Sequence, residues 1–211
     1  MLAGEPYHRS ISANPGDQRT RGRFVRLALG LMPPGQRLLD FGAGTGIDAK
    51  IYAAAGHTVW TYDSDEAQNA YLAVHCRDEI ARRTIIPTAY PPAEKLKAIT
   101  ANFAVLNLVA DPSALFASFS RILEEDGFVL VSLLNPYFLG DARYGWWRAN
   151  LPGLLRHGHY SVGRVHRYGV RAMADHAAPH FRLEQIRPHR AALPTRQYMF
   201  LLFRRVSETS R

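Results

Sequence analysis

The sequence contains little cysteine, and no long apolar run, and each absence excludes a class of protein. Cys76 is the one cysteine of the chain, so neither an internal disulfide framework nor a cysteine-cluster metal site can form within it. No run of about 18 uninterrupted apolar residues occurs, and the first thirty residues lack the pattern of a secretory signal. We therefore expect a soluble, cytoplasmic protein that does not cross a membrane.

Lysine is scarce, and acidic residues are scarce in the C-terminal third. The net charge is +8, and between Arg143 and Arg211 there are 13 arginines against three acidic residues. Dense cationic surface attracts phosphate backbones, but charge alone specifies no partner, and a solvated basic face is the alternative. A nucleic-acid partner therefore stays open without being favoured, since no RNA-binding module is evident.

The length and the apolar content predict one domain. With 211 residues and 47% hydrophobic residues, the chain can bury one sizeable core, so we expect a single domain over residues 1–211. Residues 1–18 are polar and are interrupted by Pro15 and Gly16. This segment is predicted to be a flexible arm or a lid.

Helical and strand patterns alternate along most of the chain. Alternation of this kind implies parallel strands joined by helical crossovers, hence a doubly wound α/β fold. Helical spacing is present in residues 19–31, 47–55, 65–82, 112–123 and 170–178, and strand patterns in residues 37–41, 58–62, 84–87, 96–101, 127–134, 181–187 and 196–205.

Residues 136–167 interrupt this alternation. Their pattern is irregular and rich in aromatic side chains, and we interpret the segment as a cap insertion after the fifth strand. Within it, Tyr144, Trp146 and Trp147 lie beside Arg143 and Arg148, which offers stacking surface and bidentate donors to an aromatic or anionic substrate. The alternative is an apolar latch that packs on the sheet.

The segment Asp40-Phe41-Gly42-Ala43-Gly44-Thr45-Gly46 joins a predicted strand to a predicted helix. Glycines at such a junction let the backbone approach a ligand closely. The dinucleotide fingerprint requires its third glycine at the position of Ile47, so the spacing disfavours a nicotinamide or flavin cofactor.

Asp63 ends the second predicted strand. There a carboxylate can accept hydrogen bonds from both hydroxyl groups of a ribose. Its alternative role is an N-cap of the next helix, which Ser64 or Asp65 can also provide.

The order of these motifs resembles that of the class I S-adenosylmethionine-dependent methyltransferases. A fourth strand that ends at Asn102, the sequence Arg121-Ile122-Leu123 and the turn at Gly127 continue the likeness, which extends from Arg19 to Arg205. The resemblance implies a Rossmann-like seven-stranded sheet in the order 3-2-1-4-5-7-6 with one antiparallel strand, and S-adenosyl-L-methionine as cofactor. The cofactor-binding residues that we assign are Asp40, Gly42, Ala43, Gly44, Gly46, Asp63, Ser64, Asn102 and Phe103.

One departure from the family concerns adenine. The family commonly has an acidic residue after the third strand for the adenine amino group, whereas this chain has Thr88, Ala89 and Tyr90 there. No residue is therefore assigned to adenine.

Methyl transfer needs alignment of the reactants and, for a hydroxyl or protonated amine acceptor, a base. If residues 160–168 are extended, His166 and Tyr168 share one face with Tyr160, Val162 and Arg164. We predict His166 as the base and Tyr168 as a group that orients the substrate, with an ordinary surface histidine as the alternative.

No metal site is predicted. His176 and His180 stand four residues apart but lack a supporting carboxylate ligand. The predicted enzyme methylates oxygen or nitrogen of a small molecule. The alternatives are a methyltransferase that acts on RNA or protein, and a protein that binds the cofactor without turnover.

Overall fold

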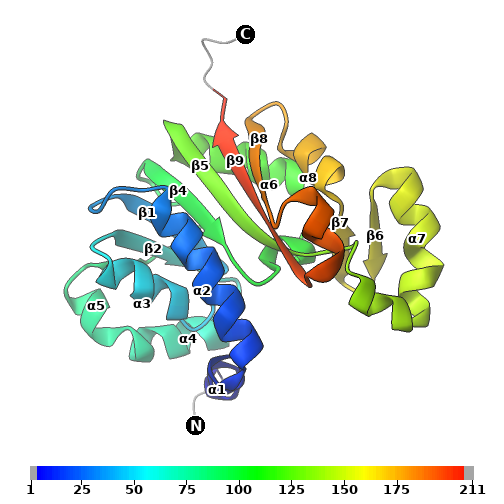
Figure 1. The fold of residues 1–211 in the computed structure, drawn as a ribbon. Coiled ribbons are helices and arrows are strands. Elements are labelled where there is room, and N and C mark those ends of the chain that lie inside the picture. The colour runs from blue at the N-terminus through cyan, green and yellow to red at the C-terminus, as the bar shows by residue number, and fades with distance from the viewer. Residues whose placement is uncertain (1–3, 207–211) are drawn as a thin grey trace. The chain divides into compact units, whose positions relative to one another are not determined.

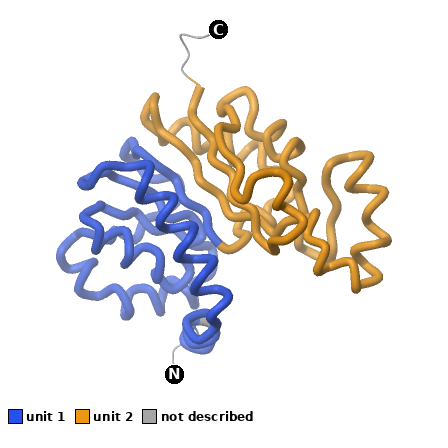
Figure 2. Tube along the Cα trace, viewed as in Figure 1, with its two compact units in different colours: residues 1–102 blue, residues 103–211 orange. Residues whose placement is uncertain are grey.

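A computed structural model describes residues 4–206 of the chain (Figure 1). Contacts divide the molecule after Asn102 into two compact units, residues 1–102 and residues 103–211 (Figure 2). Within residues 4–206, no helix is both long and apolar enough to span a membrane.

The first unit alternates helices with parallel strands. Strand β1 (Arg37–Phe41) pairs with β2 (Thr58–Tyr62) and with β4 (Leu96–Ala101), and β2 pairs with β3 (Ile85–Pro87). The bounds predicted for the first, second and fourth strands are confirmed. The helices of this unit are α1 (Glu5–Ala13), α2 (Pro15–Gly30), α3 (Ile47–Ala54), α4 (Glu66–His75) and α5 (Arg77–Ala81).

Both faces of the first unit's sheet are covered. Leu38 and Leu39 are neighbours on β1, so their side chains point to opposite faces, and both are fully buried. Val59 and Trp60 repeat this arrangement on β2. Burial on both faces explains why these strands have continuous apolar sequences rather than alternating ones.

The N-terminal segment, for which we predicted a flexible arm or a lid, contains helix α1 and the start of α2. Pro15 and Gly16 do not prevent helix formation, because Pro15 occupies the first position of α2, where a proline is tolerated. The side chain of Asn14 caps this helix by accepting hydrogen bonds from the amides of Gly16 and Asp17. Ile11 is buried, so the core already includes α1. Residues 1–3 lie outside the described part, and the lid function stays a prediction.

The predicted helix over residues 65–82 is two helices. Cys76 separates α4 from α5 with non-helical backbone angles (φ −106°, ψ 21°). Its thiol is fully buried and donates to the carbonyl of Gly46 at 3.7 Å. Burial of a small apolar side chain against the glycine loop accompanies the interruption, which helical periodicity alone did not predict.

The second unit consists of antiparallel strands with helices, and it includes the cap, residues 136–167. Strand β9 (Tyr198–Arg205) pairs antiparallel with β5 (Leu123–Leu134) and with β8 (Phe181–Arg187). Phenylalanine side chains from α6 (Pro112–Ile122), β5 and β9 form its core. Its other elements are η1 (Val105–Leu108), η2 (Leu139–Arg143), α7 (Gly145–His157), β6 (His159–Val162), β7 (Val165–Tyr168), α8 (Val170–Ala177) and η3 (Arg190–Thr195).

The strand order of the large sheet is β3-β2-β1-β4-β5-β9-β8, with β9 antiparallel. Since β6 and β7 form a separate two-stranded sheet, β8 and β9 are the sixth and seventh strands of the predicted order, 3-2-1-4-5-7-6. The predicted Rossmann-like fold is confirmed.

Residues 136–167 are more regular than the sequence suggested. They contain η2, α7 and the hairpin of β6 and β7, whose register pairs Val162 with Val165. Our assumption of one extended run over residues 160–168 was wrong, because Gly163 adopts a left-handed φ of +59° and the chain turns back. Consequently, His166 and Tyr168 share a face with Ser161, and Tyr160 faces the opposite way.

Candidate functional site

The glycine loop lies between β1 and α3 and has the backbone geometry that only glycine adopts easily. Gly42, Gly44 and Gly46 have φ angles of +76°, +53° and +79°. The amides of Gly42 and Ala43 both donate to the carbonyl of Tyr62, at 2.8 and 3.0 Å, which ties the loop to the end of β2. The three glycines therefore follow from the path of the backbone itself.

Asp63 closes this loop. Its Oδ2 accepts a hydrogen bond from the amide of Gly44 at 2.8 Å, and its Oδ1 accepts one from the amide of Asp65 at 2.9 Å. Asp65 caps α4 by accepting from Ala67, so the capping role belongs to Asp65 rather than to Asp63. A carboxylate offers about four acceptor positions, which leaves Asp63 free capacity for ribose hydroxyls, and Ser64 lies exposed beside it.

Two carboxylates are buried behind the loop. Asp48, on the first turn of α3, accepts a hydrogen bond from Asn102 Nδ2 at 2.7 Å and lies 2.6 Å from Nε of Arg21. Asp40, at the end of β1, is 2% exposed, and Thr100 Oγ1 donates to its Oδ1 at 3.4 Å. The Arg21 guanidinium neutralises the charge of Asp48, so the net charge of this pair depends on the state of Asp40.

The electrostatic state of Asp40 follows from its position. Burial, and then the Asp48 carboxylate, raise the pKa of Asp40 well above its ordinary value, against the effect of the Arg21 guanidinium. Its Oδ2 is buried and has no hydrogen-bond partner within residues 4–206. An unpartnered buried acceptor beneath a glycine loop suits a cationic donor, such as the ammonium group of an amino acid ligand.

Replacing Asp40 by asparagine should therefore change how stability depends on pH. Because the folded-state pKa of Asp40 lies above its unfolded-state value, the stability contributed by this group falls as pH rises through the folded-state pKa. Asp40→Asn removes this loss. The free energy of unfolding of the variant, relative to that of the parent, should therefore increase by up to about 1.4 kcal/mol per pH unit within that window. Urea unfolding from pH 4.5 to 7.5 measures this, with exposed Asp78→Asn as the control. A constant difference between variant and parent would contradict it.

Helix α1 contacts the loop through residues that the sequence analysis did not identify. His8 Nδ1 lies 3.0 Å from Thr45 Oγ1, and His75 Nδ1 donates to the Thr45 carbonyl at 2.8 Å. The rings of His8 and His75 are in contact, with centroids 4.5 Å apart. Burial, followed by His75 and Arg21, lowers the pKa of His8. No spacing signal marks His8, whereas Asp48 was visible as an acidic residue two positions after Gly46.

The remaining predicted residues belong to the second unit. Phe103 has a left-handed φ of +52°, and its ring lies 5.8 Å from that of Tyr198. His166 Nδ1 lies 2.8 Å from Ser161 Oγ, and the ring of Tyr168 stacks 6.1 Å away. The hydroxyl of Tyr168 is directed at the carbonyls of Val109 and Ala110, at 2.7 and 3.0 Å.

In the first unit the structure bonds Gly44 to Asp63 and Asn102 to Asp48, and in the second it places His166 beside Tyr168. Which of them touch a ligand stays a prediction. Among the residues of both units that the structure describes, no three histidine, cysteine, aspartate or glutamate side chains are grouped as metal ligands.

Comparison with known structures shows the same fold in many proteins. A TehB-like S-adenosylmethionine-dependent methyltransferase from Corynebacterium glutamicum is 16% identical, with a TM-score of 0.65, over 96% of this chain and 97% of that one. Magnesium protoporphyrin IX methyltransferase from Synechocystis, solved with bound S-adenosylhomocysteine, is 18% identical, with a TM-score of 0.67, over 96% and 94%. The [4+2]-cyclase SpnF is 16% identical, with a TM-score of 0.71, over 96% and 93%.

Sequence comparison defines the family. No curated protein matches the chain. The model of the methyltransferase domain family matches residues 17–170, which include the glycine loop, Asp63 and the cap. The chain belongs to this methyltransferase family, whose place among the S-adenosylmethionine-dependent class I enzymes agrees with the order of its motifs and with its sheet.

Proposed function

We propose that the protein transfers a methyl group from S-adenosylmethionine to an oxygen or nitrogen atom of a small aromatic or anionic molecule. The main observation for the cofactor site is the bond between Asp63 and the Gly44 amide, because it holds an acidic acceptor against a loop whose backbone angles favour glycine. Asp63 would accept the ribose hydroxyls, and Asp40 would face the ammonium group of the methionine moiety. The bound cofactor supplies a methyl group activated by a sulfonium.

Replacing Asp63 by alanine is the direct test of the cofactor site. It removes two charge-assisted hydrogen bonds to the ribose and should weaken binding of S-adenosylmethionine by about 1.5–3 kcal/mol, or roughly ten- to a hundredfold. Calorimetry with the cofactor and with S-adenosylhomocysteine measures this loss.

Asp65→Ala is the matched control for this experiment. It removes the neighbouring carboxylate, which caps α4, and should cost about 1 kcal/mol of stability with little change in affinity. Equal affinity of Asp63→Ala and the parent would refute the ribose assignment. Tighter binding of NAD than of S-adenosylmethionine would refute the cofactor itself.

The substrate class is inferred from the cap, residues 136–167. The guanidinium of Arg143 lies 4.8 Å from the ring centroid of Tyr144, which stacks on Trp146 at 5.8 Å and 12°. The guanidinium of Arg167 lies 5.4 Å from the ring of Trp146. Alternating cations and flat rings are suited to aromatic rings and to carboxylate or phosphate groups.

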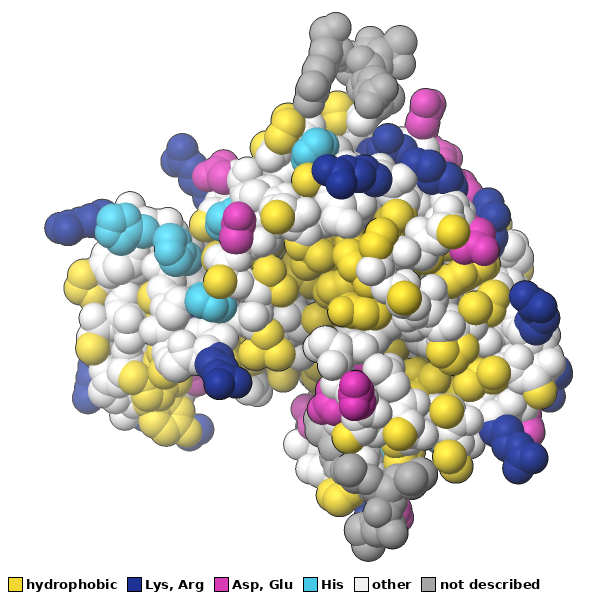
Figure 3. Space-filling view, turned by 180° about the vertical axis from the view of Figure 1, so that it is seen from behind, with side chains coloured by type: hydrophobic (Ala, Val, Ile, Leu, Met, Phe, Trp, Pro, Cys, Tyr) yellow, Lys and Arg dark blue, Asp and Glu magenta, His cyan; other side chains and the backbone are white. Residues whose placement is uncertain are grey.

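The positive charge of the second unit supports the alternative that the protein methylates RNA. Arginine and histidine side chains are numerous there, and histidines gather over the cap and its surroundings (Figure 3). Transfer of a labelled methyl group to aromatic and anionic metabolites, compared with transfer to RNA and to protein, distinguishes the acceptors. Cofactor binding without transfer to any of them would favour a protein that binds without turnover.

We propose His166 as the base that takes the proton of the acceptor. Its Nδ1 is engaged by Ser161, so Nε2 is the ring nitrogen left for the proton. Tyr168 would act as a positioning residue, because its ring stacks on the imidazole while its hydroxyl is held by backbone carbonyls. With the cofactor bound as methyl donor, His166 would take the acceptor's proton on Nε2 as the acceptor atom gains the methyl group.

The pH dependence of kcat tests this role. His166→Ala should lower kcat by about 10²–10⁴-fold and should change the pH dependence of kcat, because the group that takes the acceptor's proton is lost. His159→Ala, which alters an exposed histidine on the partner strand of the same hairpin, is the matched control. An unchanged profile in His166→Ala would make His166 an ordinary surface residue.

A further inference from the structure

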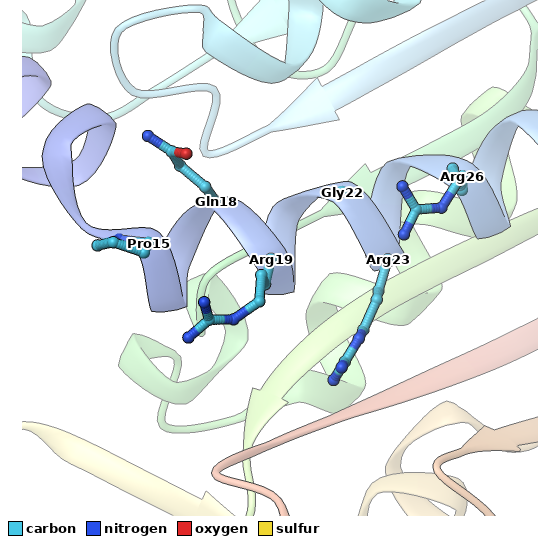
Figure 4. A pocket seen from close by; sticks show the side chains of 6 residues that line it. All are labelled: Pro15, Gln18, Arg19, Gly22, Arg23 and Arg26. Carbon is cyan, nitrogen blue, oxygen red and sulfur yellow. The ribbon is translucent and has the colours of Figure 1, made fainter.

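The exposed side of α2 carries a row of arginines. Arg19, Arg23 and Arg26 are separated by four and three residues, so they lie above one another on one face of the helix. Figure 4 shows their side chains along α2, with Gly22 between them. Arg21, on the opposite side, is engaged with Asp48 and does not belong to this row.

A hollow of about 500 Å³ accompanies the arginine row. The residues that line it are Pro15, Gln18, Arg19, Gly22, Arg23 and Arg26 (Figure 4). Among the residues whose side chains the structure describes, the lining contains cationic and amide groups and no aromatic ring, so it offers donors to an anion and no stacking surface to a base.

The arginine row is electrostatically uncompensated. Among residues 4–206, no carboxylate lies within ion-pair distance of Arg19, Arg23 or Arg26. Like charges three or four residues apart on a helix repel each other, so the row opposes helix formation unless an anion neutralises it.

Gly22 is not required by the packing of the free protein. Glycine in a helix interior is less favourable than alanine, and among the described atoms the nearest to a methyl group at this position is the tip of Arg26, at 3.4 Å. Because Gly22 has no side chain, the helix backbone is accessible at the bottom of the hollow, where a ligand can approach.

We propose that this face of α2 binds a chain of phosphate groups. Seven residues of helix span about 10 Å, which exceeds the size of one phosphate group and is comparable to a chain of three or more linked phosphates. Guanidinium groups bind phosphate oxygens in a bidentate manner, and three of them in a row match successive phosphates. The phosphates can belong to a free oligophosphate or to the backbone of a single-stranded nucleic acid, because both present the same chemistry.

Titration of the full chain at low ionic strength tests the proposal. Tripolyphosphate and a short single-stranded oligouridylate are the two probes, and orthophosphate should bind at least about tenfold more weakly than the better of them. Binding of tripolyphosphate assigns the site to a free ligand, whereas binding of the oligonucleotide alone assigns it to a nucleic-acid backbone. Binding of neither would overturn the proposal.

Charge variants show whether binding occurs at this face. Arg19→Gln combined with Arg23→Gln should weaken binding of the effective probe by about tenfold or more. Arg77→Gln combined with Arg82→Gln removes two exposed arginines at α5 in the same unit and should change affinity less than about twofold. An equal loss in both variants would mean unspecific attraction by net charge and would refute the site.

Gly22→Ala provides a test that does not depend on charge. It should raise the melting temperature, since alanine favours the helix, and should weaken binding several-fold because the methyl group occupies the floor of the hollow. Gly30→Ala, at the end of α2 with no atom within 4 Å of an added Cβ, should leave binding unchanged. Unchanged binding in Gly22→Ala would exclude the hollow as the contact point.

Discussion

Replacing Arg21 by methionine is expected to lower the free energy of unfolding by about 3–5 kcal/mol, because it leaves the Asp48 carboxylate buried without its cation. The side chains of both residues are about nine-tenths buried, and Nε of Arg21 lies 2.6 Å from Oδ1 of Asp48. The hydrogen bond from Asn102 remains, but an amide does not neutralise a charge. Urea unfolding of the parent and of Arg21→Met measures the loss.

The loss should depend on pH in a definite direction. Burial raises the pKa of Asp48, while Arg21 and then the hydrogen bond from Asn102 lower it. Without Arg21 the folded-state pKa rises further above the unfolded value, so the buried group is neutral at acidic pH and charged at higher pH. The stability it contributes is therefore present near pH 4 and is lost as pH rises through the folded-state pKa.

Two further variants isolate this ion pair. Arg23→Met changes an exposed arginine on the same helix and should alter stability by no more than about 0.5 kcal/mol. Asp48→Asn, added to Arg21→Met, removes the orphaned charge and should recover part of the loss, most clearly at neutral pH. An equal loss in Arg21→Met and Arg23→Met, or a loss independent of pH, would show that the ion pair does not stabilise the fold.

Gly46→Ala should destabilise the protein by about 2–5 kcal/mol and abolish measurable cofactor binding. The left-handed φ of +79° costs an alanine about 1–2 kcal/mol, and its Cβ would lie 2.5 Å from Cys76 Sγ and 3.1 Å from Leu72 Cγ. Relief of such overpacking costs about 1–3 kcal/mol more and requires α4 or the loop to move. Thermal unfolding and calorimetry with S-adenosylmethionine measure the two effects.

Gly35→Ala separates backbone strain from the clash. Gly35 has a similar φ of +83°, but no atom lies within 4 Å of an added Cβ, so this variant should lose only about 1–2 kcal/mol and keep its cofactor affinity. Cys76→Ala in the Gly46→Ala background removes the sulfur atom and should restore part of the stability. Equal losses in Gly35→Ala and Gly46→Ala would mean that contact with α4 does not shape the loop.

Local sequence patterns predicted the strands of the large sheet well and the cap, residues 136–167, poorly. The bounds of β1, β2 and β4 follow from short apolar runs ended by turn residues, because these strands are buried on both faces. The hairpin of β6 and β7 is only partly buried and contains arginine, serine and histidine, so no apolar alternation marked its turn at Gly163. Pro15 was misinterpreted for a related reason: a proline marks either a break or the first turn of a helix, and the cap at Asn14 decided between them.

The sequence by itself determined the succession of strand, glycine loop and helix, the acidic residue after the second strand, and through the motif order the topology of the sheet. These features depend on residues that are close together in the sequence, so their spacing can be read directly from it. Only the tertiary structure decided that Arg21 pairs with Asp48, that His8 contacts Thr45, and that the pKa of Asp40 is raised. Ion pairs, ring contacts and desolvation depend on which distant residues the fold brings together, and the sequence does not state those distances.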